Sequence, residues 1–200
     1  IPLVSKDGRV VDLVRKDDLF PERLPAMKAV VMAGGFGTRL GSLTKDTPKP
    51  MLPVGDKPVM EKLIGQLKEA GVNQVNISNH FKPEKIQEHF GAGEEYGIDI
   101  NYVSEEVPMG TAGTLTLMEP SEETILVVNG DIVTDLDFKA MFAFHHEQHA
   151  EMTIGVRQYD LNIPYGVIEH EGMYVKGVSE KPTYSYFVNA GIYLIEPTVQ

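Results

Sequence analysis

Strand-like and helix-like patterns alternate along most of this chain, and the alternation limits its possible folds more than any other feature. It begins near Met27 and continues to about residue 157. Residues 124–129 are nearly all apolar, which is typical of a strand covered on both faces. Residues 58–70 instead have a helical period, with one apolar stripe formed by Met60, Leu63, Ile64 and Leu67. Such alternation indicates an open, mostly parallel sheet.

The same periods predict the order of the elements. We expect strands over residues 28–33, 74–78, 98–103, 124–129, 152–156, 166–169, 174–178 and 187–195. We expect helices over residues 58–70, 83–90, 111–118 and 137–149. The last strands follow each other without a helix between them, which favours antiparallel pairing. The predicted fold is therefore α/β, a Rossmann-like open, mostly parallel sheet with helices on both faces and an antiparallel addition in the C-terminal part.

The first part of the chain follows a different pattern, so we expect two units, residues 1–25 and a domain over residues 26–200. The pair Asp7-Gly8 between two apolar runs predicts a hairpin, and Pro21 and Pro25 predict a linker after it. The chain opens without Met and stops just after an apparent strand. We therefore expect both ends to be cut and the larger domain to be truncated at its C-terminal end.

Charge and composition exclude several classes of function. The chain has 18 Lys and Arg against 29 Asp and Glu, a net charge of −11, so nucleic acid is not an expected partner. It has no cysteine, which excludes disulfides and thiolate metal sites. No apolar run reaches membrane-spanning length and no signal peptide opens the chain, so we expect no membrane partner and a cytoplasmic location.

A glycine-rich turn over residues 32–40 follows the first predicted strand of the larger domain. It contains Gly34, Gly35 and Gly37. Glycine lets the backbone take positive φ and approach a ligand, and successive N–H groups in such a turn form a site for anions. The turn lacks the Gly-Lys-Ser/Thr ending of a P-loop, and Leu40 stands where a dinucleotide fingerprint needs glycine. Four cations lie in or soon after it, as a triphosphate requires: Arg39, Lys45, Lys49 and Lys57.

Further short motifs follow this turn. They are Pro48-Lys49-Pro50-Met51-Leu52-Pro53-Val54, Gly110-Thr111-Ala112-Gly113, Asn129-Gly130-Asp131, Pro164-Tyr165-Gly166-Val167, Glu180-Lys181-Pro182 and Asn189-Ala190-Gly191. Together with residues 34–40, and in the family's order, they resemble the signature of the sugar-1-phosphate nucleotidyltransferases, in its guanylyltransferase-like form, over roughly residues 27–197. One departure is Gly41-Ser42, where the family has a basic or polar residue and then proline. This change would loosen the turn.

The resemblance implies an enzyme that transfers a nucleotidyl group from an NTP to a sugar 1-phosphate, which gives an NDP-sugar and pyrophosphate. Because this reaction brings anions together, it depends on positioning and on neutralising charge. The resemblance assigns catalysis to Arg39, Lys49 and Asp131. It assigns nucleotide binding to Ala33, Gly34, Gly35, Gly37, Thr38, Glu105, Gly110 and Thr111. It assigns sugar-phosphate binding to Gly166, Glu180, Lys181 and Asn189.

Asp131 is also the expected metal ligand. It follows the apolar strand over residues 124–129 and so lies at the carboxyl edge of the sheet, where ligands bind in open α/β folds. A carboxylate together with phosphate oxygens suits Mg²⁺, the cofactor that the resemblance implies. The resemblance also implies a second metal carboxylate beyond Gln200. The alternative role for Asp131 is that of a turn or helix-capping residue.

Glu105 is the residue that we expect to read the base. The resemblance places a base-contacting residue five positions before Gly110, and relatives that use uracil or thymine nucleotides carry Gln there. Guanine offers N1–H and the N2 amine as neighbouring donors, and a carboxylate only accepts. We therefore favour GTP, with a thymidylyl- or uridylyltransferase as the alternative. Otherwise Glu105 and Glu106 would form a solvated charge pair.

Two further interpretations concern the protein as a whole. Residues 1–20 resemble the closing part of a CBS module, which would place an adenine-nucleotide effector on a regulatory module that is missing here. From another functional class, the chain would be a non-catalytic regulatory subunit that keeps the fold. The sequence leaves a homo-oligomer open.

His145 and His149 lie one turn apart on the last predicted helix, a spacing that can hold a metal. No partner ligand stands near them in the sequence. We therefore expect both rings on a solvated helix face.

Overall fold

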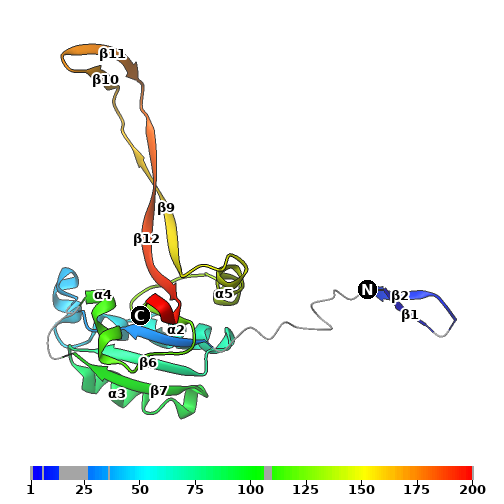
Figure 1. Cartoon of the computed structure of the whole chain (residues 1–200). Helices are drawn as coiled ribbons and strands as arrows, with labels where there is room; N and C mark the ends of the chain where they lie inside the picture. Colours follow the sequence, from blue (N-terminus) through cyan, green and yellow to red (C-terminus); the bar gives the residue numbers. More distant parts are fainter. Residues whose placement is uncertain (1, 6, 14–26, 36, 106–109, 200) are drawn as a thin grey trace.

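A six-stranded sheet forms the centre of the molecule (Figure 1). The computed structural model describes residues 2–5, 7–13, 27–35, 37–105 and 110–199. The strands of the sheet, in spatial order, are β7 (Asp99–Ser104), β6 (Gln74–Asn79), β3 (Lys28–Met32), β8 (Ile125–Asn129), β12 (Thr183–Ile195) and β9 (Met152–Asn162). The first four run parallel, whereas β12 is antiparallel to β8 and β9 is antiparallel to β12. The predicted α/β fold is confirmed.

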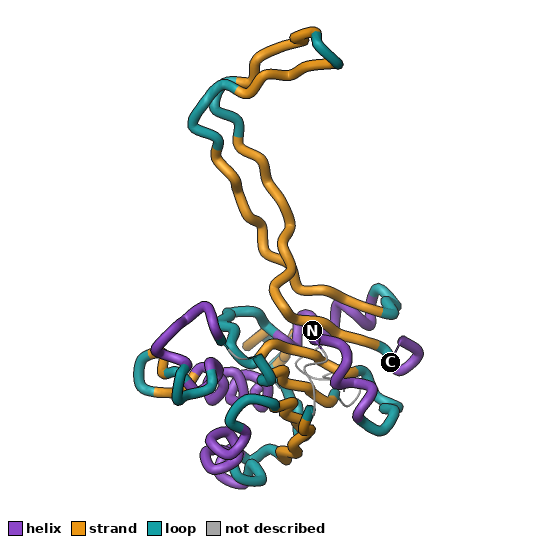
Figure 2. Tube along the Cα trace, turned by 90° about the vertical axis from the view of Figure 1, so that its left-hand side faces the viewer, coloured by secondary structure: helices purple, strands orange, loops and turns teal. Residues whose placement is uncertain are grey.

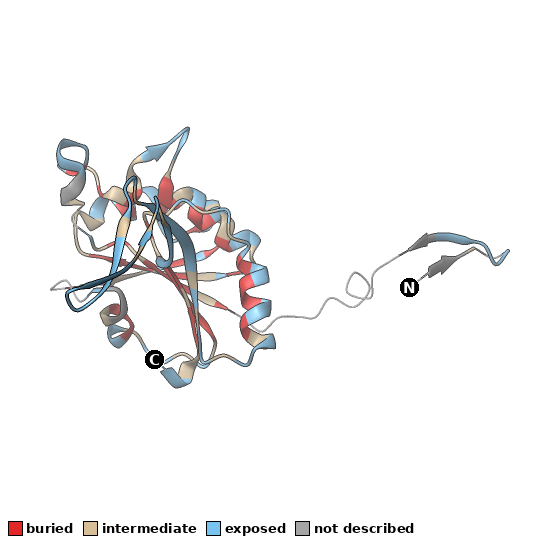
Figure 3. Ribbon diagram, turned by 90° about the horizontal axis from the view of Figure 1, so that it is seen from above, coloured by how far each residue is buried: buried red, intermediate tan, exposed pale blue. Residues whose placement is uncertain are grey.

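The central strands are apolar on both faces because both faces are covered. Ala29 of β3 and Leu126 of β8 belong to one hydrophobic cluster. Their neighbours Val30 and Ile125 belong to another. Figure 3 shows the buried residues gathered in these strands and on the inner sides of helices. The helices that contribute to the larger cluster are α2 (Val59–Glu69), α3 (Pro83–Phe90) and α5 (Phe138–Glu147). Two-sided burial explains the continuous apolar run over residues 124–129.

The helices form where the sequence pattern predicts them. The apolar stripe of α2 is buried, and α3 begins and ends at the predicted residues. α5 begins after Asp137, whose carboxylate accepts from the amide of Ala140 at 3.0 Å and so caps the helix. The predicted helix over residues 111–118 is a short α4 (Gly110–Gly113) followed by the 3-10 turn η4 (Thr114–Leu117). The other 3-10 turns are η1 (Thr38–Thr44), η2 (Lys49–Met51), η3 (Glu94–Tyr96) and η5 (Pro197–Val199).

β9 and β12 extend beyond the sheet as a two-stranded ribbon, which Figure 2 shows from the side. The predicted strands over residues 152–156 and 187–195 form only part of them, because β9 continues to Asn162 and β12 starts at Thr183. Polar residues alternate with Tyr and Leu over residues 158–162, a period of two that is typical of a strand and that the prediction did not include. The hairpin of β10 (Val167–Glu171) and β11 (Tyr174–Ser179) lies at the far end of the ribbon (Figure 1).

Two small hairpins complete the described structure. The predicted N-terminal hairpin is present, with β1 (Pro2–Val4) antiparallel to β2 (Val10–Leu13). Residues 14–26, with the predicted linker, lie outside the described residues. A second pair joins β4 (Pro53–Val54) to β5 (Lys57–Pro58). Across the described parts of the chain, none of the helices has the length and apolar character needed to cross a membrane.

Candidate active site

The glycine-rich turn and Asp131 follow two adjacent strands of the sheet and lie side by side. β3 and β8 are adjacent parallel strands with Met32 opposite Asn129, so the segments that follow them meet at the carboxyl edge. The amide of Gly130 donates to the carbonyl of Met32 at 2.9 Å. A Cβ added to Gly130 would lie 3.0 Å from Cε of Met60, in the core. Glycine therefore lets the chain pass closely over the core and brings Asp131 to this edge.

Lys49 and Asp131 meet at the edge. The Lys49 ammonium donates a hydrogen bond to Oδ2 of Asp131, although 82 positions separate the two residues. Lys49 opens η2, in which Pro50 is buried. The Lys49 side chain is 41% exposed and that of Asp131 is 28% exposed. A cation and a carboxylate are thus held together where a ligand can reach both.

The glycine-rich turn packs against the segment that carries Lys49. Gly37 has a left-handed φ of 63°, and a Cβ added there would lie 2.9 Å from Cγ2 of Thr44 and 3.4 Å from Cβ of Lys49. The buried Thr44 donates from its hydroxyl to the carbonyl of Gly37 at 2.8 Å. Both the φ angle and the close approach require glycine at position 37. These contacts fix the turn relative to Lys49.

Part of the predicted phosphate site lies outside the described residues. The backbone of Arg39 lies in η1, but the side chains of Arg39, Thr38 and Thr111 are not described, and neither is Phe36. The position of the guanidinium relative to Lys49 and Asp131 therefore stays a prediction.

Gly41 interrupts η1 with φ of 56° and ψ of −120°. The glycine that departs from the family pattern therefore forms a sharp kink, with a backbone conformation that other residues rarely adopt.

Glu105 is buried beside the turn, so the alternative of a solvated charge pair is wrong for this residue. It follows β7 and is only 7% exposed. Its Oε1 accepts hydrogen bonds from the hydroxyls of Ser78 and Thr114. A Cβ added to Gly34 would lie 3.5 Å from the other carboxylate oxygen, Oε2. Ala33 and Gly34, which are predicted to bind the nucleotide, therefore share one region with Glu105, and the amide of Ala33 donates to the carbonyl of Ser78 at 2.8 Å.

The four predicted sugar-phosphate residues lie in two places. Asn189 lies in the bulge of β12, where its Oδ1 accepts from the amide of Gly191 at 2.8 Å, and Gly191 packs against the side chain of Asn129 near the site edge. Gly166 and Glu180 face each other at the base of the β10–β11 hairpin, where a Cβ added to Gly166 would lie 3.1 Å from Oε2 of Glu180. Lys181 follows directly, with φ of 47°.

The ribbon separates these two places. Residues 183–189 of β12 stay paired with β9. At ~3.3 Å for each residue of a strand, this segment spans ~20 Å. The structure therefore places Asn189 beside Gly191, which packs against Asn129, but leaves Glu180 and Lys181 at the far end of the ribbon (Figure 2).

The cations after the turn do not all face one ligand. Lys57 pairs with Glu61 of α2 at 2.8 Å, and this hydrogen bond raises the pKa of Lys57 and lowers the pKa of Glu61. Nε2 of His89 lies 2.9 Å from the same carboxylate of Glu61. Lys57 was grouped with Lys49 because the two residues are close along the chain. In the structure, Lys57 pairs instead with Glu61 of α2.

A metal ion at this edge would depend on Asp131. Among the residues that the structure describes, no three His, Cys, Asp or Glu side chains are grouped closely enough to hold a metal. Asp131 is a single, partly exposed carboxylate whose partner is a lysine. Mg²⁺ is commonly held by one or two carboxylates with substrate phosphates and water, so this donor fits a Mg²⁺ that arrives with a nucleotide.

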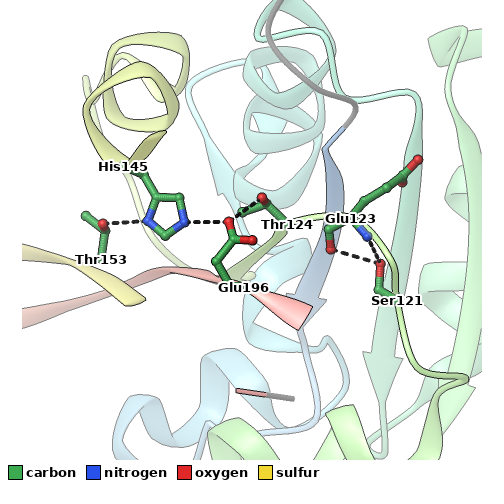
Figure 4. Close-up of polar contacts among 6 residues, drawn as sticks. All are labelled: Ser121, Glu123, Thr124, His145, Thr153 and Glu196. Atoms are coloured by element: carbon green, nitrogen blue, oxygen red, sulfur yellow. Dashed lines mark hydrogen bonds and ion pairs between the residues drawn. The ribbon is translucent and has the colours of Figure 1, made fainter. Parts of the chain in front are cut away.

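The prediction that His145 lies on a solvated helix face is wrong. His145 is 1% exposed, with Nε2 2.9 Å from Oε1 of Glu196 and Nδ1 2.7 Å from Oγ1 of Thr153 (Figure 4). Glu196 also accepts from the hydroxyl of Thr124 at 2.6 Å. Burial raises the pKa of Glu196, but the hydrogen bonds from Thr124 and His145 outweigh it and the pKa is lowered. His149 is exposed as predicted, but it lies beyond the end of α5 and has a φ of 50°.

This network lies at the edge of the sheet opposite Asp131, because Thr124 comes just before β8. The sequence contained a signal for it. His145 stands three and four positions after Phe142 and Met141 and seven after Phe138, so it continues the buried stripe of α5.

Comparison with known proteins identifies the family of the chain. Residues 28–200 match the family described as nucleotidyl transferase. Over 181 residues the chain is 36% identical to the mannose-1-phosphate guanylyltransferase catalytic subunit beta of Dictyostelium discoideum, which covers 86% of this chain and 50% of that protein. The chain thus spans about half the length of the curated relatives that it matches.

Solved structures share the fold. A Bacillus anthracis protein assigned as a glucose-1-phosphate thymidylyltransferase, in complex with a sucrose, superposes with a TM-score of 0.70 at 26% identity, covering 86% of this chain and 72% of the other. HddC from Yersinia pseudotuberculosis, complexed with GMP-PN, superposes with a TM-score of 0.63 at 25% identity over 86% and 77%. On the family match, which extends over most of its length, the chain belongs to the nucleotidyl transferase family.

Proposed function

We propose that this chain forms the nucleotide-binding part of an enzyme that transfers a nucleotidyl group from an NTP, with GTP favoured, to a sugar 1-phosphate, giving an NDP-sugar and pyrophosphate. The observation that carries the proposal is the meeting of Lys49 and Asp131 beside the glycine-rich turn at the carboxyl edge of the sheet. Relatives named as mannose-1-phosphate guanylyltransferases support it. The proposal concerns the whole protein, because the chain spans half of their length.

The chemistry follows from the charges. An oxygen of the sugar phosphate attacks the α-phosphorus of the nucleotide in line, its bond to phosphorus forms as the bond to pyrophosphate breaks, and negative charge moves to the departing pyrophosphate. The Lys49 ammonium would neutralise charge on the phosphates, and Arg39 has the same proposed role. N–H groups of the glycine-rich turn after Ala33 would bind the β- and γ-phosphates, since the amide of Ala33 already donates to the carbonyl of Ser78. Asp131 holds the ammonium at the edge before the nucleotide arrives.

Asp131 is also the residue that would hold Mg²⁺, together with phosphate oxygens. When bound, the ion would draw charge from the phosphates and align them for attack. The Lys49 ammonium, which lies beside this carboxylate, would contact the phosphates directly.

The preference for GTP rests on Glu105. Its carboxylate is buried beside Gly34, so a base in this region would meet an acceptor. Guanine presents two neighbouring donors, whereas the carbonyls of uracil would be repelled. The solved relative that is complexed with GMP-PN and the guanylyltransferase relatives support this preference. Mannose 1-phosphate is the first sugar phosphate to test.

Residues 1–25 are proposed to be the end of a CBS-like module and its linker. The family match begins at residue 28, and residues 2–13 contain an isolated antiparallel hairpin. If the module is present in the full-length protein, AMP or ATP raises the melting temperature of that protein. Unchanged melting with both nucleotides would remove this part of the proposal.

The test of the main proposal is pyrophosphate release from the full-length protein with Mg²⁺. GTP, UTP and dTTP are each combined with the 1-phosphates of mannose, glucose and glucosamine. The proposal expects release with GTP and one of these sugar phosphates. Release only with UTP or dTTP would favour the thymidylyl- or uridylyltransferase alternative, and no release with any pair would favour the non-catalytic regulatory subunit.

A further inference from the structure

Three elements bring a buried polar cluster together behind Glu105. Ser78 comes from β6, Thr114 from η4 and Glu105 from the end of β7. Ser78 and Thr114 are fully buried. Both hydroxyls contact the same carboxylate oxygen, Oε1 of Glu105, and their own oxygens lie 3.1 Å apart. The cluster was not expected from the sequence, because its members are far apart along the chain.

The backbone around Glu105 is held as well. Its amide donates to the carbonyl of Asn79 at 3.1 Å, which continues the pairing of β6 with β7. Its carbonyl lies 2.7 Å from Nδ1 of His80. Main chain and side chain are therefore both fixed, and the carboxylate cannot rotate freely about its terminal torsion, which is otherwise broad.

The direction of these hydrogen bonds decides which oxygen faces the nucleotide site. An ionised carboxylate only accepts, so Ser78 and Thr114 each donate a proton to Oε1 and together occupy its two lone pairs. Oε2 then lies on the side of Gly34, 3.5 Å from where a Cβ of that residue would stand. The two hydroxyls therefore fix Oε2 as the carboxylate oxygen on the side of the glycine-rich turn.

We propose that Ser78 and Thr114 are positioning residues that determine base selectivity by fixing the carboxylate of Glu105 with Oε2 toward the nucleotide. This inference rests on the proposed function of the site. Without the two hydroxyls the carboxylate rotates, and its acceptor is no longer aligned with the donors of guanine. Selectivity for GTP over UTP then falls even though Glu105 is still present.

The experiment compares binding of GTP and UTP to the full-length protein by calorimetry. The variants Ser78→Ala and Thr114→Val remove one hydroxyl each with little change of shape, and Thr114→Ser restores the hydroxyl. We expect each removal to lower the ratio of GTP to UTP affinity by about tenfold, as for the loss of a hydrogen bond to a charged group. Thr114→Ser should keep most of the wild-type ratio.

Thr116→Val is the matched control, because it removes an exposed threonine hydroxyl from the same 3-10 turn, one that donates only to the carbonyl of Gly113. It should leave the ratio unchanged. If Ser78 and Thr114 only fill space, GTP and UTP affinity change together and the ratio stays constant, which overturns the inference. Melting temperatures show whether each variant is folded.

Binding and turnover separate the two proposals. Wild-type protein that binds GTP preferentially but releases no pyrophosphate contradicts the proposed reaction, while the ratios in the variants still decide the role of the hydroxyls. Wild-type protein that binds neither nucleotide overturns both.

Discussion

At the scale of single residues, motifs identified the charged groups but not what holds them. Lys49 and Asp131 were predicted from the sequence, and the structure places them in contact. The residues that hold these two side chains in place were only partly predictable from the sequence. Gly37 was expected to let the backbone approach a ligand, whereas the structure shows that it also leaves space for Thr44. Such three-dimensional packing has no signature in the order of residues.

Gly130 gives a test of this packing. In Gly130→Ala, the added Cβ would lie 3.0 Å from Cε of Met60 and 3.2 Å from the carbonyl oxygen of Met32. We expect the free energy of unfolding to fall by ~1–3 kcal/mol, because the core must shift. Chemical denaturation of the two proteins measures the change.

The control is Gly65→Ala in α2, where an added Cβ meets no atom within 4 Å. Alanine is the better helix former, so this variant should be more stable by up to ~1 kcal/mol. A stable Gly130→Ala protein with full activity would show that the chain has room at position 130.

At the scale of elements, the sequence predicted strands and helices well where both faces or one stripe are apolar. It predicted only part of β9 and β12, the two strands of the ribbon. One face of the ribbon carries apolar and aromatic side chains that stay exposed, Tyr159, Leu161, Tyr184, Tyr186 and Val188, and the other is mostly polar. A two-stranded ribbon buries little by itself and is marginally stable in water. The strand preference of these residues, without a buried face, was therefore not enough to predict the length of the ribbon.

Hydrogen exchange should separate the ribbon from the sheet. In the chain of residues 1–200, amides of β3 and β8 are buried between neighbouring strands, whereas residues 157–162 pair only with β12. We expect the amides of residues 157–162 to exchange faster than those of β8 by at least about tenfold. Equal protection in both segments would mean that the ribbon is covered in solution.

The His145–Glu196 network joins α5 to the end of β12 and predicts a pH effect. The pKa of Glu196 is lowered in the fold from an ordinary value of 4.5, so its ionised form stabilises the folded state. That contribution is complete above pH 4.5 and is lost as the pH falls below this value toward the lower folded pKa. The neighbours that face Glu196 are Thr124, His145 and the more distant His146.

Unfolding by denaturant at pH 7 and pH 3.5 tests this effect. Wild-type protein should lose more stability between the two pH values than Glu196→Gln, because the amide does not titrate. Exposed Glu147 of α5 provides the control substitution, Glu147→Gln, which should behave as wild type. An equal loss in wild type and Glu196→Gln would remove Glu196 as the cause.

At the scale of the whole molecule, the fold class and the edge that carries the site followed from the alternation of elements. Parallel strands place their carboxyl ends together, so Asp131 was expected at this edge, and the pairing of β3 with β8 brings the glycine-rich turn beside it. The predicted sugar-phosphate residues could not be placed in this way, because their positions depend on the path of the ribbon. Glu180 lies near Gly166 and away from Asn189.

The role of Lys49 can be measured directly in the full-length protein through kcat/KM for pyrophosphate release. Lys49→Ala should lower it by about 10²–10³-fold, the usual cost of removing a group that stabilises developing charge. Lys28→Ala is the matched control, because Lys28 also pairs with a carboxylate, Glu123 at 3.6 Å, and is similarly exposed, but lies at the opposite edge of the sheet. This variant should keep kcat/KM within about twofold of wild type, since it removes a surface ion pair away from the site. Equal rates for Lys49→Ala and Lys28→Ala would contradict a phosphate site at Lys49 and Asp131.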